Sequence, residues 1–463
     1  MLAIQTDLSQ HAPRAEADLC ELLRIPSVSA ISAHAPDIQR AADWLHGYFR
    51  DLGYQSAIHA TPGHPIVLAR TPAVDGAITV LVYGHYDVQP PDPLGQWISP
   101  PFEPTVRQGN LFARGATDDK GQFLTHVQSA ASWTRTAGAP PVNLIFLIEG
   151  EEEIGSPNLV PFLQRHASEL ACDVAVISDT SQFAPDLPAI TYGLRGIAYY
   201  ELTLTGPRQD LHSGTFGGGV TNPANVLVKI LGNLHDSHGR VAIPGFYDAV
   251  VPLTDRERQE YAQLPFTDQA FFEQVGVSGA FGEAGYTTLE RRWARPTCDI
   301  NGLTSGYQGE GAKTVLPARA SAKFSFRLVP RQDPHALSAS LREWIAEQIP
   351  AGITWELTDF HGAPGVLVSL DSPYVACAQR AIEQGFGRAP VFIREGGSIP
   401  IVGDFKEILG VDTLLLGWGQ NDDNMHSPNE KFSLADYHRG IRASAALWEE
   451  FAKLPRPAGK GNV

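Results

Sequence analysis

The chain has 463 residues, a length greater than one hydrophobic core usually spans. Its apolar content of 43% is enough to build two or three domains. Its 35 lysines and arginines stand against 51 aspartates and glutamates, giving a formal charge of −16 at pH 7. There is no dense basic stripe to neutralise a phosphate backbone and no run of roughly 18 apolar residues, so neither nucleic acid nor a membrane is an expected partner.

The cysteines and the start of the chain bear on its cellular compartment. The four cysteines form no C-x-x-C pair and have no short spacing of the kind that disulfide frameworks or structural zinc knuckles use. They are Cys20, Cys172, Cys298 and Cys377. Residues 1–7 lack the basic segment that opens a secretory signal. We therefore expect reduced, buried thiols and a cytoplasmic location.

The first predicted elements alternate between helices and buried strands. Residues 37–54 form the first predicted helix, because their apolar side chains recur on one face. Short runs that are apolar on both faces then occur at 78–83, 142–148, 173–177 and 411–416, with a helix predicted at 120–134. Buried strands alternating with helices indicate an α/β fold whose mostly parallel sheet is covered by helices on both sides.

A different pattern begins near residue 199. Apolar and polar residues alternate strictly at 200–205 and 323–328, which is typical of antiparallel strands with one buried face. Helices predicted at 223–234 and 337–349 would cover that face. Residues 197–364 are therefore predicted to be an inserted α+β domain. Residues 1–196 and 365–463, with helices predicted at 372–384 and 433–451, would form the other domain.

Ionisable residues follow the predicted buried strands at their carboxyl ends. His85 follows the first strand, Glu153 the second and Asp179 the third, and the fourth leads to a loop ending at His426. Open α/β sheets bind their ligands at this edge. Asp118 lies in a glycine-containing turn before a helix, and we expect all five side chains to meet in one crevice.

The chemistry of these five side chains favours a pair of metal ions. Imidazole and carboxylate ligands together suit zinc, and also manganese, whereas calcium and magnesium favour oxygen ligands alone. Two neighbouring ions need a carboxylate that bridges them, and Asp118 is the candidate. Asp87, two residues beyond His85, is predicted to orient that imidazole.

Each of these signals is weak when it is taken singly. A His-x-Asp pair occurs by chance, an Asp-Asp pair is commonly a turn, residues 151–153 could be a solvated charge run, and a lone histidine such as His426 is more often structural than a ligand. Together they favour the metal site, because a structural role gives no reason for all of them to follow strand ends.

The sequence resembles the M20 metallopeptidase family, most closely its cytosolic dipeptidase (carnosinase-like) branch. The matching segments occur in family order from residue 84 to 430, which makes chance similarity very improbable. They are GHYDVQP at 84–90, RGATDDKG at 114–121, EGEEEIGS at 149–156, SD at 178–179, TYGLRG at 191–196, DLHSG at 210–214, KTV at 313–315, FSFRLVP at 324–330, REGGSIP at 394–400 and HSPNE at 426–430.

The resemblance implies a ligand set and a general base. His85, Asp118 and Asp179 would hold one ion, and Asp118, Glu153 and His426 the other. The ions would be two divalent cations, with zinc the first choice and manganese or cobalt the alternatives. Asp118 would be followed by a cis peptide bond. Glu152, next to the ligand Glu153, would be the catalytic base, although the additional acid Glu151 leaves room for a register error of one residue.

The resemblance also implies how a small peptide substrate is held. Thr314, Arg327 and Ser398 match positions that bind the carboxylate end of the substrate, and Glu395 one near its amino end. His212 would stabilise the oxyanion and, in a homodimer, reach the active site of the neighbouring subunit. The resemblance further implies that residues 1–196 and 365–463 form the catalytic di-metal domain and that residues 197–364 form an inserted lid or dimerisation domain. Residues 243–296 receive no functional interpretation.

The function expected is hydrolysis of dipeptides or short peptides through a metal-bridging water and the Glu152 carboxylate. The alternatives are an N-acyl amino acid amidohydrolase or a carboxypeptidase of the same superfamily and, more remotely, a homologue that has lost its metals and only binds ligands. A serine hydrolase is disfavoured because the sequence has no Gly-x-Ser-x-Gly elbow.

Overall fold

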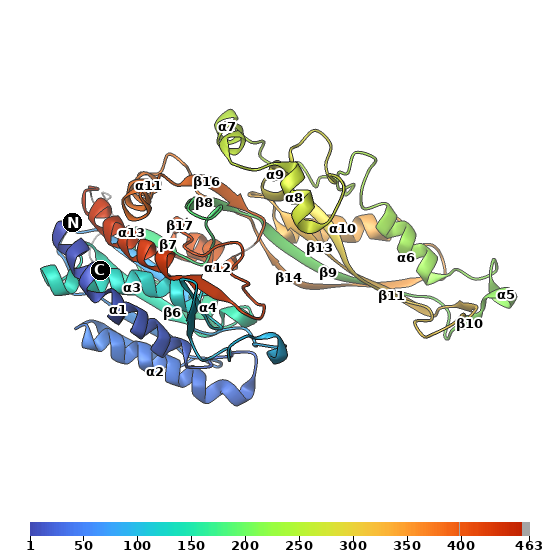
Figure 1. Ribbon diagram of the computed structural model, residues 1–463. Coiled ribbons are helices and arrows are strands. Elements are labelled where there is room, and N and C mark those ends of the chain that lie inside the picture. The colour runs from blue at the N-terminus through green and yellow to red at the C-terminus, as the bar shows by residue number, and fades with distance from the viewer. Residues whose placement is uncertain (398, 456–463) are drawn as a thin grey trace. The chain divides into compact units, whose positions relative to one another are not determined.

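The computed structural model describes residues 1–397 and 399–455 (Figure 1). The chain divides into two compact units. The first consists of Met1–Tyr192, Val368–Ile393 and Asp404–Val463, and the second of Gly193–Leu367 and Arg394–Gly403. The short segment Arg394–Gly403 is a second excursion into the second unit that the sequence pattern did not indicate.

The first unit is built on a mixed sheet, which confirms the α/β fold class. In spatial order its strands are β1 (Gln55–His59), β2 (Ile66–Arg70), β6 (Asn143–Glu149), β3 (Thr79–His85), β7 (Val174–Ile177), β17 (Thr413–Leu415) and β8 (Ala189–Leu194). The four strands from β6 to β17 are parallel, as the apolar runs predicted. The strands outside them pair antiparallel, and β16 (Val391–Glu395) also pairs with β8.

Aromatic contacts show which elements cover each face of this sheet. Phe146 of β6 lies 5.1 Å, centroid to centroid, from Phe49 of α2 (Ala35–Asp51). Phe146 is paired with Val82, so both point to the α2 side, and the next residue, Tyr83, points to the other. Tyr83 accordingly meets Phe405 of the π-helical turn η4 (Phe405–Leu409), with 5.7 Å between ring centroids.

The long helices stack on the α2 side of the sheet. α3 (Lys120–Ala137) packs on β3, where a side chain at Gly84 would collide with Phe123. α1 (Leu2–Leu23) and α13 (Leu434–Ala452) pack on α3, and Trp448 donates to Ser129 Oγ at 2.8 Å. α11 (Pro373–Phe386) packs on α13. α4 (Leu159–His166) lies on the opposite face with Phe162 against His59 of β1.

A small three-stranded sheet joins two distant loops of the first unit. β5 (Asn110–Phe112) pairs with β4 (Thr105–Arg107) on one side and with β18 (Lys431–Ser433) on the other. This pairing places the turn at residues 113–118 beside the loop at 423–430, which matters for the site described below.

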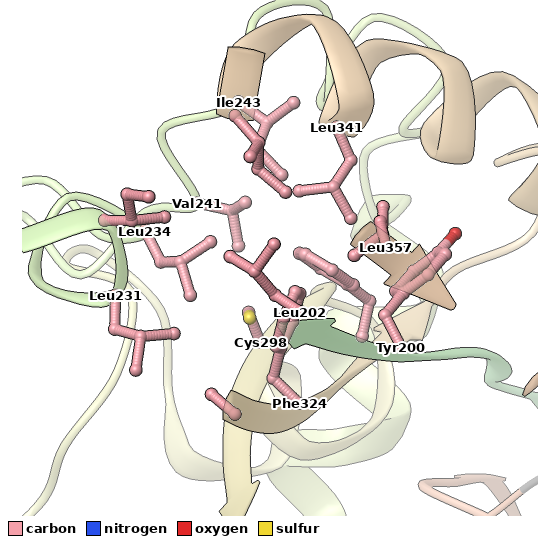
Figure 2. Close-up of a cluster of buried hydrophobic side chains, with 14 of the residues drawn as sticks. Tyr200, Leu202, Leu231, Leu234, Val241, Ile243, Cys298, Phe324, Leu341 and Leu357 are labelled. Atoms are coloured by element: carbon pink, nitrogen blue, oxygen red, sulfur yellow. The ribbon is translucent and has the colours of Figure 1, made fainter. Parts of the chain in front are cut away.

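The second unit contains the alternating strands that the sequence predicted. Its antiparallel sheet has the order β11 (Thr297–Ser305), β13 (Arg319–Leu328), β9 (Gly196–Thr205) and β14 (Thr354–Ala363). Two helices, α6 (Pro223–Gly232) and α10 (Pro334–Ala346), cover its apolar face. Figure 2 shows the resulting core, in which Leu202 and Phe324 from the sheet meet Leu231 and Leu341 from the helical side.

Short elements complete the described part of the chain. In the second unit they are β10 (Leu211–His212), α5 (Ser213–Phe216), α7 (Asp255–Gln263), α8 (Asp268–Val275), α9 (Thr288–Trp293), β12 (Val315–Leu316) and β15 (Val366–Leu367). The remaining ones are η1 (Ser32–His34), η2 (Leu94–Gln96), η3 (Glu152–Ile154) and α12 (Pro400–Asp404). All four cysteines are free thiols. Within residues 1–397 and 399–455, no helix combines the length and apolarity that crossing a bilayer requires.

Candidate metal centre

The five predicted ligands come from strand ends and from the two loops that the small sheet joins. His85 is the last residue of β3, and Asp179 follows β7 by two residues. Glu153 lies in η3, the turn just after β6. Asp118 precedes α3, and His426 lies in the loop before β18. The parallel strands thus deliver three of the side chains to one edge of the sheet, as predicted.

The structure brings all five side chains together around Asp118. Its Oδ1 lies 3.1 Å from His85 Nε2, and its Oδ2 lies 2.9 Å from His426 Nε2. Asp179 Oδ2 is 3.9 Å from His85 Nε2, and Glu153 Oε2 is 3.3 Å from His426 Nε2. Two triads result, His85–Asp118–Asp179 and Asp118–Glu153–His426, in each of which the potential ligand atoms lie within 4.8 Å of one another.

The peptide bond that follows Asp118, between Asp118 and Asp119, is cis. This confirms the detail that the family resemblance implied.

The donor chemistry of the two triads fits divalent cations. Each triad offers one imidazole nitrogen and two carboxylates, a combination suited to zinc and similar ions. The carboxylates also repel one another: burial, with a further contribution from Asp118, raises the pKa of Asp179 to about 7. Burial alone would raise the pKa of Asp118 too, but His426 and His85 lower it below its ordinary value. A cation in each triad would relieve the repulsion, so the residues present suit a dinuclear site.

Asp87 organises the site through two different groups. Its backbone carbonyl accepts a hydrogen bond from His85 Nδ1 at 3.1 Å, which leaves Nε2 free to face Asp118. Its carboxylate is 3.5 Å from the same nitrogen and instead accepts the backbone N–H groups of Glu152 at 3.2 Å and Glu153 at 3.1 Å. Asp87 therefore holds the imidazole and the turn that carries the predicted base and ligand.

The environment of Glu152 raises its proton affinity. Burial raises the pKa of this carboxyl to about 8, opposed by His85 and reinforced by Asp179, Glu153 and Asp118. Without cations, this carboxyl therefore holds its proton to a higher pH than an ordinary glutamate.

Glu151 plays a different part from its two neighbours. Its carboxylate accepts the backbone N–H of His64 at 2.9 Å and the side-chain amide of Asn158 at 2.8 Å. The side chain is buried away from both triads. Of the three consecutive glutamates, Glu153 is the one that belongs to a triad.

Sequence reasoning missed several residues that hold the ligands in place. The buried carboxylate of Glu430 accepts hydrogen bonds from three backbone N–H groups of the turn before α3. They belong to Gly115 at 2.9 Å, Thr117 at 2.9 Å and Asp118 at 3.1 Å. Its other partner is Arg114 Nη1 at 2.8 Å. Glu430 belongs to the HSPNE segment, and that membership was the only signal in the sequence.

Two further supports lie beside the ligands. Gln89 donates to Glu153 Oε2 at 2.8 Å. His126 of α3 lies 2.7 Å from the hydroxyl of Ser178, the residue before Asp179. Burial lowers the pKa of His126 to about 3, so this imidazole is neutral and acts as a hydrogen-bonding support.

The predicted substrate-binding residues lie in the second unit, in two groups. His212 of β10 is paired with Val315 of β12, and Thr314 O accepts the N–H of Ser213 at 3.1 Å, so His212 and Thr314 are neighbours. Arg327 lies near the end of β13. The backbone carbonyl of Glu395 accepts the backbone N–H of Arg195 at 3.2 Å. Ser398, the remaining one, lies outside the described residues.

The two groups lie at opposite ends of β13. β12 precedes the start of this strand at Arg319, whereas Arg327 is close to its end. Eight residue steps at about 3.3 Å separate these positions by roughly 26 Å. Figure 1 shows the β10 segment beyond one end of the four-stranded sheet. His212 therefore lies beside the end of β13 that is opposite to Arg327.

Comparisons with known proteins identify relatives of this chain. Residues 81–450 match the model of peptidase family M20/M25/M40. The chain is 34% identical over 452 residues to the Cys-Gly metallodipeptidase dug1 of Schizosaccharomyces pombe, covering 94% of this chain and 95% of the relative. It is 32% identical to the human Beta-Ala-His dipeptidase, covering 98% and 89%. The solved M20 family metallo-carboxypeptidase Sso-CP2 from Sulfolobus solfataricus superposes with a TM-score of 0.83 at 32% identity, covering 95% and 99%.

Proposed function

The chain belongs to the M20/M25/M40 peptidase family, and from this premise we propose that it hydrolyses dipeptides or short peptides at a centre of two divalent metal ions. The observation that carries the proposal is the pair of triads that share Asp118, with one carboxylate oxygen facing each imidazole. The relatives named for Cys-Gly and Beta-Ala-His dipeptides indicate the substrate class.

The bound ions would supply Lewis acidity, which lowers the pKa of water at the centre and polarises the scissile carbonyl. His85, Asp118 and Asp179 would hold one ion, and Asp118, Glu153 and His426 the other. Zinc is our first choice of metal because the donors are mixed nitrogen and oxygen, and manganese and cobalt suit the same donors.

Glu152 is the proposed general base. With the cations bound, its pKa falls from the metal-free value of about 8, since positive charge favours the carboxylate. The ionised carboxylate takes a proton from the attacking water and later returns it to the departing amine. Asp87 serves this step by fixing the backbone N–H of Glu152.

His212 is proposed to act on the active site of a second copy of the chain. Its Nδ1 accepts the backbone N–H groups of Gly214 at 3.0 Å and Thr215 at 3.2 Å. The proton of the neutral imidazole therefore lies on Nε2, which is the atom that can donate to an oxyanion. Because Arg327 lies at the far end of β13, a homodimer would bring the two residues to one substrate.

The ends of the substrate are assigned to the remaining predicted residues. Arg327, Thr314 and Ser398 would bind the carboxylate end, and Arg327 supplies the planar, bidentate fork suited to a carboxylate. Glu395 would bind the amino end. A cytoplasmic location, like the dimer, stays a prediction.

The test is a substrate screen on metal-free protein reloaded with zinc, manganese or cobalt. Dipeptides with a free amino end and a free carboxylate end should be hydrolysed in the reloaded samples and not in the metal-free one. The carboxypeptidase alternative is favoured by the similarity to Sso-CP2 and predicts that longer peptides lose their last residue faster than dipeptides are cut. An N-acyl amino acid amidohydrolase would prefer acylated single residues, and a homologue that has lost its metals would be inactive in every sample.

A further inference from the structure

The stretch 243–296, which received no function from its sequence, contains a helix whose capping glutamate also contacts the 394–397 segment. Glu257, the third residue of α7, forms a capping box with Thr254: its Oε2 accepts the Thr254 N–H at 2.8 Å, and its N–H donates to Thr254 Oγ1 at 3.2 Å. The other oxygen, Oε1, pairs with the guanidinium of Arg394. Both side chains are buried, with 9% of Glu257 and 7% of Arg394 exposed.

Helix α9 has the same arrangement, a capping glutamate that also pairs with an arginine, and this arginine belongs to α7. Glu290 accepts the N–H of Thr287 through Oε2 at 2.8 Å and the guanidinium of Arg258 through Oε1 at 3.0 Å. Arg258 is the residue after Glu257. Two capping boxes and two ion pairs therefore join α9 to α7, and α7 to Arg394.

Arg394 immediately precedes Glu395, the residue proposed to bind the amino end of the substrate. Gly396, two residues after Arg394, has two further close neighbours, Arg195 and Arg292. Arg195 Nε donates to the carbonyl of Gly396 at 3.2 Å. A Cβ at Gly396 would lie 2.9 Å from Arg195 Nη2 and 3.1 Å from the carbonyl oxygen of Arg292, in the last turn of α9. A larger residue at this position would therefore have to displace Arg195 or the end of α9.

Two arginines lie near the half-buried side chain of Glu395. Burial raises its pKa, and Arg292, the Gly396 N–H and Arg195 oppose that shift. A displacement of the segment would change how far Glu395 lies from these cations and from anything it binds.

We propose that helices α7 and α9 form a brace for residues 394–397, in which Glu257 is a positioning residue that acts through Arg394 to fix Glu395 for recognition of the substrate's amino group. This inference rests on the proposed function, which supplies the role of Glu395. It assigns a specificity role to a stretch whose own side chains need not touch the substrate.

The test compares Glu257→Gln, Arg394→Gln and the double variant with Glu283→Gln. Glu283 is a matched control, because it is a buried glutamate of the same stretch whose carboxylate pairs with Arg295 at 2.6 and 2.7 Å, inside the stretch. Arg394→Lys keeps the charge without the fork and serves if a glutamine variant fails to fold.

The first readout is the discrimination between alanyl-alanine and propionyl-alanine, which lacks the amino group. It is measured as the inhibition constant of propionyl-alanine divided by that of alanyl-alanine. We expect each glutamine variant to lower this ratio about tenfold while kcat changes much less. The double variant should lose no more than either single one, because the two residues act as one pair. Arg394→Lys should retain part of the discrimination, and Glu283→Gln all of it.

The second readout is backbone amide exchange of the peptide covering residues 391–400, which requires no activity. Exchange should become faster in the Glu257 and Arg394 variants and stay unchanged in Glu283→Gln. If the wild type cuts no dipeptide, the proposed function fails while this exchange result still decides the brace. Exchange and discrimination that match the Glu283→Gln control would overturn the inference.

Discussion

The carboxylate of Glu430 accepts the backbone N–H of Asp118 at 3.1 Å, so a residue that is not itself a proposed ligand fixes the one that both metal triads share. The same carboxylate holds the N–H groups of Gly115 and Thr117. The turn that presents Asp118 is thus folded around a single buried acid.

This relationship predicts that Glu430→Ala weakens metal binding without removing a ligand. Loss of the carboxylate leaves buried N–H groups and the Arg114 charge without their partner, which should cost about 3–5 kcal/mol of stability. The affinity for metal should fall about 10- to 100-fold, as for other supports of metal ligands. Metal titration and thermal unfolding measure the two effects. Exposed Glu407→Ala is the control, and equal metal affinity in both variants would contradict the role of Glu430.

Adjacent glutamates provide a sharp test of the catalytic base. Glu152→Gln should retain both metals and lose at least about 100-fold in kcat, because no carboxylate is left to take the proton. Glu151→Gln should retain most of its turnover and lose stability, since its carboxylate bonds His64 and Asn158 and belongs to neither triad. Metal analysis and kinetics on the two variants separate the roles. Near-normal turnover in metal-loaded Glu152→Gln would show that another group is the base.

The stability of the metal-free protein should fall as the pH rises from about 5 to 8. The raised pKa values of Asp179, about 7, and Glu152, about 8, mean that the folded protein keeps protons that unfolded carboxyls lose near pH 4. Hydrogen bonds to Asp118 and Glu153 raise the pKa of His426 to about 10, which acts in the same direction above pH 6.5.

Thermal unfolding in a chelator at pH 5.5, 7 and 8.5 measures this dependence. We expect the unfolding temperature to fall by more than about 5 °C over this range and bound zinc to remove most of the decline. A metal-free protein that becomes more stable toward pH 8.5 would show that the carboxylates are not repelling one another.

Mixed dimers test whether His212 serves the partner's active site. His212→Ala and Glu152→Gln should each be nearly inactive alone. After the two are unfolded together and refolded, the heterodimer has one site with an intact Glu152 and a His212 from the other chain, so activity should reappear. No recovery, in a mixture shown to contain heterodimers, would place His212 in its own chain's site.

The sequence predicted the parts of the site that depend on strand ends and on family motifs. Strands β3, β6 and β7 are buried on both faces, so their continuous apolar runs identified them in the sequence. His85, Glu153 and Asp179 were then predicted because they follow the ends of these runs. Asp118 and His426 come from loops far apart in the sequence, which the small β4–β5–β18 sheet and the Glu430 carboxylate bring together. The sequence offered them as candidates from a glycine-containing turn and from the loop after the fourth predicted strand, and the family motifs assigned each to an ion.

Other features had no local signal. Strand β1, with the sequence QSAIH, is only half-buried at the edge of the sheet and lacks an apolar run. Helix α1 contains Pro13, which obscures a helical pattern. Glu430 and Glu257 look like ordinary acids in the sequence, because a buried carboxylate is specified by the N–H groups and arginines that surround it, and those come from distant parts of the chain.

The metal content of the purified, zinc-reconstituted protein tests the central claim most directly, when it is measured for the wild type and for His85→Ala, His426→Ala and Asp118→Ala. Two triads that share Asp118 predict two ions per chain in the wild type and the loss of one high-affinity ion in each histidine variant. They also predict weaker binding of both ions in Asp118→Ala. A wild-type protein that binds fewer than two ions, or an Asp118→Ala variant that binds both with unchanged affinity, would contradict the dinuclear centre.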